Sequence, residues 1–419
     1  YEPRIYFGEQ MEHFSIVGRG DTNEPREVDN PSGGEDSRYA YEGDGGVSIG
    51  TPLRQAAHAI TQRDIKFLLS DAVGEDSRLM EHRTPKDRVK RVAPWLTIDD
   101  DVYPTIVDGR IKWVVDGYTT SQNYPYSTAF SMSGVQSGQV SSVQTQRSSS
   151  LVGDRINYMR NSVKATVDAY DGSVDLYAWD EEDPVLKAWQ GIFPTSYKPY
   201  SEMSAELMEH VRYPEDMFKV QRELLNRYHV TDAGSFYAGD DVWSIPNDPT
   251  TDAATAIPPY YLSMQMPEES EASFQLTTPF IPQQNEGENS RNVLYGYLAA
   301  NGDAGTGEDG VKSDEYGDLK LLELPRSSVV PGPGQAQNNF NSNTEVSSAL
   351  NLLRQGASEV LNGNMITLPV AGGILYVQPV YVRSSGGTTY PTLRKVLVSF
   401  GDKVGFADTL QEALDQVFD

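Results

Sequence analysis

The chain has 419 residues, a formal charge of −26 at pH 7 and no cysteine. A strongly acidic surface repels phosphate backbones, so the charge excludes general nucleic-acid binding and argues against docking on anionic headgroups through a broad basic face. The absence of cysteine excludes thiol catalysis, Cys-ligated zinc and iron–sulfur clusters. No run of about 20 apolar residues, the length of a spanning helix, occurs in the sequence.

The first half of the chain is predicted to pass from an irregular segment to helices and then to hairpins. Residues 1–50 are polar and rich in Gly and Pro, which predicts irregular structure. Apolar residues at three- and four-residue spacing predict helices within 53–69 and 84–93. The period then changes to two, which predicts hairpins at 103–115 and 163–179. These hairpins are expected to pair across a mobile Ser- and Gly-rich loop, 131–150.

The second half is predicted to contain further helices and strands, with the helices segregated from antiparallel pairs of strands. Helices are expected at 205–211, 214–228, 344–361 and 410–418, the last opened by a Thr409–Glu412 capping box. Strands are expected at 261–266, 273–276, 293–299, 365–370, 374–382 and 395–400. The predicted class is α+β, with antiparallel sheets and segregated helices in two to three subdomains. The expected division is an irregular 1–50, a main α+β domain 51–250 and a second α+β domain 251–419.

Motifs of the common enzyme classes, such as GxxxxGK[ST], HExxH and GxSxG, are absent, so catalysis has to be sought in single residues. Acid–base catalysis most often uses histidines or carboxylates. The catalytic candidates are Asp116, Asp168 and His210. The binding candidates, polar residues near the strand ends and the scarce cations, are Tyr118, Thr119, Arg160, Asn161, Lys164 and Arg212.

Each of these candidates has a structural alternative. Arg160 and Lys164 could hold an anionic substrate, but pairing with carboxylates such as Asp116 or Asp168 is favoured. The Asp116–Ser121 segment suits a hydroxyl-rich site, but a turn with a capped backbone is favoured there too. A histidine between two helices, as expected for His210, is more often a packed hydrogen-bonding group than a catalyst.

Turn carboxylates also raise the question of calcium, because this ion prefers several oxygens that converge from turns. The candidate ligands are Asp99, Asp101, Asp168 and Asp171. None lies in the twelve-residue loop D-x-[DN]-x-[DN]-G, and solvated turn acids are the simpler interpretation. We therefore expect no cofactor, with calcium as the alternative. The 24 tyrosines, many beside proline, favour contacts with partners, sugars or lipid headgroups as well as turn packing.

Several long segments resemble one family. They include Ile5–Glu9, Trp113–Ser121, Asn157–Asp171, His210–Phe218 and Leu375–Tyr381. The chain resembles uncharacterised protein family 182, large bacterial membrane proteins common in actinobacteria. The resemblance implies an extracytoplasmic region that follows about seven predicted membrane helices. It implies no catalytic residue or substrate.

Three functions follow as hypotheses. The first is a non-enzymatic extracytoplasmic module of a polytopic cell-membrane protein, with a binding, envelope-organising or transport-associated role. Its expected partners are its own transmembrane region, an envelope glycan or lipid, and a second copy of the chain, with no nucleic acid. The second is an envelope hydrolase or transferase that uses Asp116, Asp168 and His210, with Arg160 holding an anion. The third is a calcium-stabilised structural domain.

Overall fold

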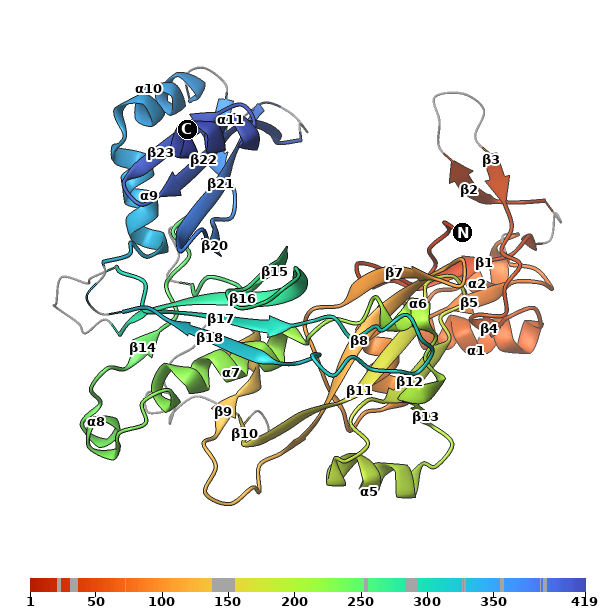
Figure 1. The fold of residues 1–419 in the computed structure, drawn as a ribbon. Coiled ribbons are helices and arrows are strands. Elements are labelled where there is room, and N and C mark those ends of the chain that lie inside the picture. Colours follow the sequence, from red (N-terminus) through yellow and green to blue (C-terminus); the bar gives the residue numbers. More distant parts are fainter. Residues whose placement is uncertain are drawn as a thin grey trace. The chain divides into compact units, whose positions relative to one another are not determined.

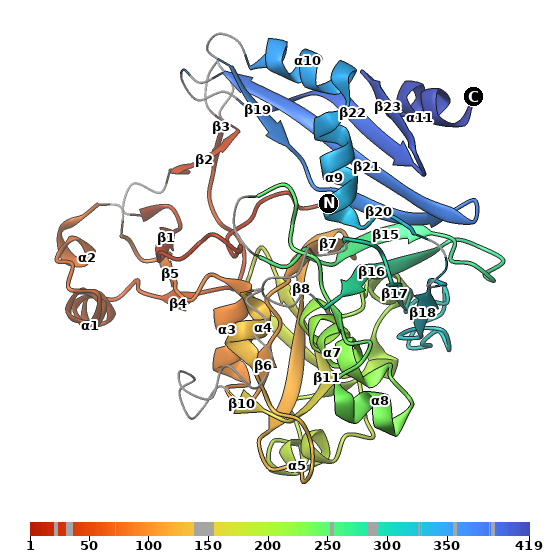
Figure 2. The same cartoon turned by 90° about the vertical axis from the view of Figure 1, so that its left-hand side faces the viewer.

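The computed structural model describes residues 1–20, 24–30, 37–71, 73–137, 155–251, 255–283, 292–325, 327, 329–354, 358–384, 386 and 390–419. Figures 1 and 2 show the elements in two views. The chain forms two compact units, each assembled from separate stretches. Unit 1 comprises residues 1–129, 156–214 and 304–313, and unit 2 comprises 130–155, 215–303 and 314–419. The division predicted from the sequence, by contrast, runs in consecutive ranges.

Unit 1 is built on a six-stranded sheet in the order β13-β12-β11-β8-β6, with β7 also paired to β8. All of its pairs are antiparallel except β12 with β13. Its strands are β6 Thr97–Ile98, β7 Tyr103–Val107, β8 Arg110–Ser121, β11 Tyr158–Asp168, β12 Val174–Ala178 and β13 Lys198–Pro199. The two predicted hairpins are confirmed as β7–β8 and β11–β12, and their expected pairing is the long β8–β11 ladder.

Helices cover the apolar face of this sheet. Val115 and Val163 lie among buried side chains that include Val89 of α3 and Leu186 of α5. The helices of this part are α3 Pro85–Val92, α5 Pro184–Ile192 and α6 Ala205–Met208, with a 3-10 turn at Tyr200–Glu202. The predicted start of α3 is confirmed, because the Thr84 hydroxyl accepts the Asp87 N–H and Pro85 follows it.

The beginning of unit 1 carries short strands and two helices. A three-stranded sheet has the order β1-β5-β4, and β2 pairs with β3. The bounds are β1 Ser15–Val17, β2 Glu27–Asn30, β3 Ser37–Tyr39, β4 Val47–Ser48, α1 Pro52–Gln62, α2 Lys66–Leu69 and β5 Arg78–Met80. The segment 1–50, predicted as irregular, therefore contains four short strands in its described residues. Ile49, Phe67, Val73 and Leu79 form a small apolar core beneath α1 and α2.

Unit 2 contains two antiparallel sheets. The first has the order β14-β16-β17-β18 with β15 added to β16, and the second has the order β19-β21-β22-β23 with β20 added to β21. Its strands are β14 Trp243–Ser244, β15 Tyr260–Met264, β16 Ser273–Pro282, β17 Gly296–Asn301, β18 Leu319–Glu323, β19 Ser358–Asn362, β20 Ile366–Val370, β21 Gly373–Ser384, β22 Thr392–Phe400 and β23 Lys403–Ala407. The pair β9 Phe130–Ser131 and β10 Arg155–Ile156 is separate.

Helices pack on both faces of the second sheet. Phe340 of α9 and Leu350 of α10 meet Tyr376 on one face, and Ala413 of α11 meets Leu375 on the other. The helices of unit 2 are α4 Met132–Gln136, α7 Glu215–Tyr228, α8 Ala233–Ala238, α9 Pro333–Ser342, α10 Thr344–Leu353 and α11 Leu410–Phe418. The capping box of α11 is confirmed in full. These elements confirm the α+β class.

One predicted element is wrong in part, and another lies largely outside the described residues. The helix predicted at 344–361 ends at Leu353, and β19 begins at Ser358, where Val360 pairs with Val382 of β21. The predicted loop 131–150 is described only up to residue 137, where it forms the end of β9 and α4. Among the helices of the described ranges, none has both the length and the apolar composition needed to cross a bilayer.

Candidate functional site

A bulge in the β8–β11 ladder brings three of the polar candidates, Asp116, Asn161 and Lys164, onto one face. Asn161 lies opposite Tyr118, Lys164 lies opposite Asp116, and the register shifts between Asn161 and Val163. Side chains three positions apart on a regular strand point to opposite faces. The extra residue of the bulge therefore lets Asn161 and Lys164 share a face.

Asp116 and Lys164 form a buried ion pair at the centre of that face. The Lys164 Nζ lies 2.5 Å from Asp116 Oδ1, and the two side chains are 0% and 2% exposed. Asn161 Nδ2 donates to the same oxygen at 2.9 Å, and Lys164 Nζ also donates to the Arg212 carbonyl at 2.9 Å. A buried charge is tolerated only when paired and hydrogen-bonded. The favoured prediction that Lys164 pairs with a carboxylate is confirmed.

Aromatic rings and a second lysine surround this pair. The Arg212 N–H donates to the Tyr103 hydroxyl at 3.0 Å, and its guanidinium lies 4.0 Å from the Tyr103 ring centre. Burial, with Asp116 nearby, raises the pKa of Tyr103, so this phenol is neutral. Lys312 Nζ donates to the Trp179 carbonyl at 3.1 Å and lies 4.0 Å from its ring centre. Burial and then the charge of Lys164 lower the pKa of Lys312.

A second polar cluster lies at the start of α5, centred on Asp183. Its carboxylate accepts hydrogen bonds from Thr119 at 2.5 Å, Ser162 at 2.6 Å and Tyr158 at 2.5 Å. It also caps the helix by accepting the N–H groups of the second and third residues of α5, at 3.0 and 3.1 Å. Burial alone would raise the pKa of Asp183, but these donors outweigh it and lower the pKa.

The sequence predicts Thr119 and Arg160 as binding residues, and Asp183 only as one of a run of turn carboxylates without a site role. The Thr119 hydroxyl belongs to the Asp183 cluster, and Arg160 pairs with Asp180 at 2.6 Å rather than with either predicted carboxylate. The signal for Asp183 is present in the sequence, because an aspartate directly before Pro184 is typical of a helix start.

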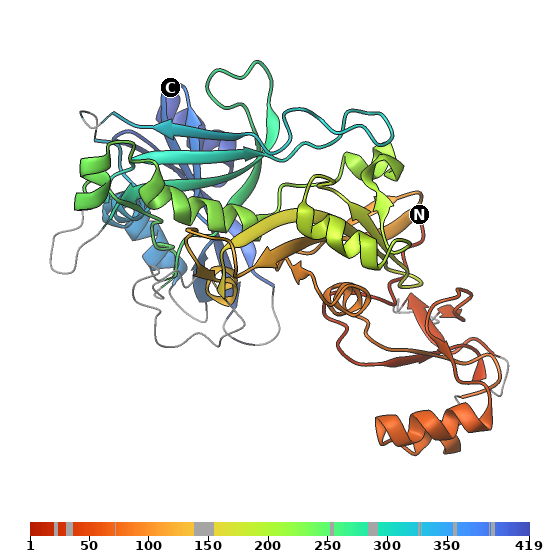
Figure 3. The same cartoon turned by 90° about the horizontal axis from the view of Figure 1, so that it is seen from below.

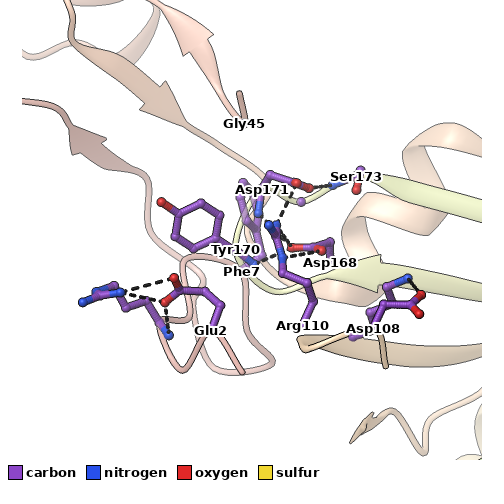
Figure 4. A network of polar contacts seen from close by, with 12 residues as sticks. Glu2, Phe7, Gly45, Asp108, Arg110, Asp168, Tyr170, Asp171 and Ser173 are labelled. Carbon is purple, nitrogen blue, oxygen red and sulfur yellow. Dashed lines mark hydrogen bonds and ion pairs between the residues drawn. The ribbon is translucent and has the colours of Figure 1, made fainter. Parts of the chain in front are cut away.

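Asp168 belongs to a third cluster, at the turn between β11 and β12 (Figure 4). The Arg110 guanidinium donates two hydrogen bonds to the Asp168 carboxylate, of 2.8 and 3.1 Å, and a third to Asp171 at 2.9 Å. Asp168 Oδ1 further accepts the N–H groups of Tyr170 and Asp171, at 2.8 and 3.1 Å. Gly172, with φ of +72°, adopts the left-handed conformation that this turn requires. Arg110, which follows the turn of the partner hairpin, is not among the site residues predicted from the sequence.

The predicted calcium ligands divide between two places. Asp168 and Asp171 are bridged by the Arg110 guanidinium, a cation already present between them. Asp99 accepts a hydrogen bond from the Tyr118 hydroxyl and another from the Asp101 N–H, the latter at 2.7 Å. Within the part of the chain that the structure describes, no group of three or more His, Asp or Glu side chains is arranged to hold a metal ion. Calcium binding stays an untested alternative.

The three catalytic candidates lie in different surroundings. Asp168 is opposite Lys112, four residues from Asp116 along β8, which separates the two aspartates by about 13 Å of strand. His210 is exposed after α6, and its ring makes no hydrogen bond or ion pair with another described residue. The structure thus gathers Asp116, Asn161 and Lys164 with the Arg212 backbone, while Asp168 is held elsewhere.

These features define an α+β protein of antiparallel sheets. The carboxylates of Asp116, Asp168 and Asp183 form ion pairs and hydrogen bonds with other residues of the sheet and its turns. Residues 1–353 match the uncharacterised protein family UPF0182. The chain belongs to this family. It is 61% identical to a UPF0182 protein of Kocuria rhizophila, 62% identical to one of Micrococcus luteus and 51% identical to one of Bifidobacterium longum, over its whole length in each case.

The chain spans about two fifths of the length of these relatives, 43%, 40% and 39% respectively. No solved structure matches it. The family membership predicted from the sequence segments is therefore confirmed, together with the occurrence of relatives in actinobacteria.

Proposed function

We propose that the chain is a non-enzymatic module that binds or organises components of the cell envelope, as an extracytoplasmic part of a membrane protein. The observation that carries this proposal is that two of the candidate catalytic carboxylates, those of Asp116 and Asp168, are already bonded to other groups of the protein. Asp116 is held by Lys164 and Asn161, and Asp168 is held by Arg110 and two backbone N–H groups. A general base needs a substrate proton within hydrogen-bond reach, and both carboxylates are already bonded to protein donors.

The alternative hydrolase or transferase requires Asp116, Asp168 and His210 to act on one substrate. The strand spacing of about 13 Å between the two aspartates counts against a joint acid–base role. The chain spans less than half the length of these relatives, which supports its being part of a larger membrane protein. Its expected partners therefore include the other regions of such a protein.

Turnover assays test the non-enzymatic role. The purified protein and its Asp116→Asn variant are compared on generic ester, phosphate and glycan substrates. We expect no turnover above buffer from either protein. Activity in the wild type that disappears in an Asp116→Asn protein whose circular dichroism shows it to be folded, while a Glu182→Gln variant of an exposed carboxylate keeps it, would refute the proposal.

The lack of cysteine offers a test of location. A Tyr390→Cys substitution places one thiol on a side chain that is 92% exposed, and a Val163→Cys substitution places one at a buried position. In intact cells that express the natural protein with these changes, a membrane-impermeant maleimide should label the Tyr390→Cys variant and leave the Val163→Cys variant unlabelled. Labelling of the Tyr390→Cys variant only after cell lysis would contradict an extracytoplasmic location.

A further inference from the structure

The helices α1 and α2 form a small lobe, residues 52–69, and most of its large aliphatic side chains are exposed. The two helices lie side by side (Figure 2). This part of the chain is coloured orange in Figure 3. Phe67 packs inward against the apolar core beneath the lobe, with Ala59 at its edge. By contrast, α1 contributes no buried side chain. The lobe therefore rests on small contacts.

The outward face of the lobe is aliphatic. Leu53, Ile60 and Leu69 are 83%, 79% and 77% exposed, and Ile65 and Leu68 are 64% and 46% exposed. Leu53, Ala57 and Ile60 follow each other at four- and three-residue spacing, so they form one stripe along α1. A surface helix normally turns such a stripe toward the core. This stripe instead faces solvent, which is typical of an interaction surface.

Cations flank the stripe in an otherwise acidic protein. Residues 51–70 carry Arg54, Arg63 and Lys66 against Asp64 alone, a net charge of +2 in a chain of −26. The three cations are exposed, and none forms an ion pair with a carboxylate of the described residues. The Asp64 carboxylate accepts the Lys66 N–H at 2.9 Å, which places it at the start of α2.

We propose that the α1–α2 lobe docks on the surface of an anionic lipid bilayer. An amphipathic helix with aliphatic side chains on one face and Lys or Arg beside them lies in the bilayer interface, where its cations reach the lipid phosphates. Because the lobe carries a net positive charge, its binding partner is expected to be anionic. The proposal deepens the envelope role proposed above and rests on it only for the presence of a membrane.

The composition of the lobe favours a bilayer over a protein partner. The aromatic anchors of protein interfaces, Trp and Tyr, are absent from residues 52–69, and Leu is under-represented among the critical residues of such interfaces. The exposed anchors here are Leu and Ile without an aromatic ring. The acidic remainder of the chain excludes a broad basic face, but at physiological salt charges are screened beyond about 8 Å. A local contact through one lobe is therefore compatible with the net charge.

Vesicle flotation tests the proposal with the full chain. The probes are vesicles of phosphatidylcholine alone and vesicles of phosphatidylcholine mixed with phosphatidylglycerol. We expect binding to the mixed vesicles, weakened by added salt. Leu53→Gln and Ile60→Gln should each weaken it about tenfold, because each removes one inserted aliphatic side chain. Arg54→Gln and Lys66→Gln should each weaken it about fivefold.

A matched control comes from α10. Leu352 is 66% exposed at the end of that helix, and Leu352→Gln should leave vesicle binding unchanged. All substituted side chains are exposed, so circular dichroism and the unfolding temperature should match the wild type. Absent binding, equal binding to both vesicle types, or equal losses with Leu352→Gln would overturn the proposal. A dimer that Leu53→Gln dissociates would also overturn it. None of these outcomes affects the turnover test of the proposed function.

Discussion

Lys164 links strands β8 and β11 through a buried ion pair, and the protein is strongly destabilised if either charge loses its partner. Its ammonium group is fully buried, so it has lost its hydration and depends on Asp116 and the Arg212 carbonyl. The exposed pair of Lys187 with Glu182, at 3.0 Å, keeps most of its hydration. Both are pairs of a lysine with a carboxylate, but loss of one partner has different consequences because only the first leaves a buried charge.

We therefore expect Lys164→Met to lower the free energy of unfolding by about 3–5 kcal/mol, measured by urea denaturation at pH 7. The Lys187→Met control should change it by about 1 kcal/mol or less. Combining Lys164→Met with Asp116→Leu should cost less than the sum of the single changes, because neither charge is then left alone. Equal effects of Lys164→Met and Lys187→Met would contradict a structural role for the buried pair.

At this scale the sequence predicts partners only where the strand register makes them neighbours. The pairing of Lys164 with Asp116 is predictable because the two hairpins place both residues on adjacent strands. The position of Asn161 depends on a bulge, which the alternation of apolar residues does not reveal. Arg160 meets Asp180 because of where the chain goes after β12, and residue type alone does not determine that.

At the scale of elements, Asp183 joins a helix to a sheet. Its carboxylate caps α5 and accepts hydroxyl donors from β8 and β11 at the same time. The lowered pKa of Asp183 means that the folded protein binds this proton less readily than the unfolded chain does. The resulting stabilisation is present above the ordinary pKa of 3.8 and is lost as the pH falls through the lower, folded-state pKa.

Asp183→Asn tests this linkage, because asparagine is also a good N-cap but carries no charge. We expect a loss of about 1–3 kcal/mol in the free energy of unfolding at pH 7. That difference from the wild type should shrink as the pH falls below about 4. Urea denaturation from pH 7 to pH 3 measures it. Asp232→Asn, at the exposed N-cap of α8, should have the smaller effect at pH 7. A pH-independent difference for Asp183→Asn would contradict the charge-based account.

Elements are predictable where their signals are local. The hairpin predicted at 103–115 turns at Asp108 and Gly109, both with positive φ. This hairpin and the capping box of α11 are set by neighbouring residues, and both predictions are confirmed. The error at 358–361 has another origin. Val360 continues the helical spacing of Val346 and Leu350, yet its pairing with β21 decides its conformation. A pattern along the chain cannot report a partner strand about twenty residues away.

At the scale of the whole molecule, the chain passes from one unit to the other five times. One short stretch, residues 304–313, returns to unit 1 between two stretches of unit 2 and is important for unit 1. The stretch 304–313 lies late in the sequence but contacts α6 and the end of β12. Asp309 accepts the Ala205 N–H at 2.7 Å, Gly310 donates to the Met203 carbonyl at 2.8 Å, and Lys312 reaches the Trp179 carbonyl. A polar, Gly-rich stretch of this kind is predicted as a loop from its sequence, and nothing in its composition indicates what it contacts.

Replacing residues 304–313 with a Gly and Ser segment of equal length should therefore loosen unit 1 and leave the second sheet of unit 2 intact. We expect faster amide hydrogen exchange in α6 and around Trp179, because the replaced stretch supplies their partners, and unchanged exchange in β20, β21 and β22. Asp309→Asn should give part of the effect at α6. Glu308→Gln, an exposed neighbour in the same stretch, should give none. Equal acceleration in both units, or unchanged protection at α6, would show that this stretch is a passive connection.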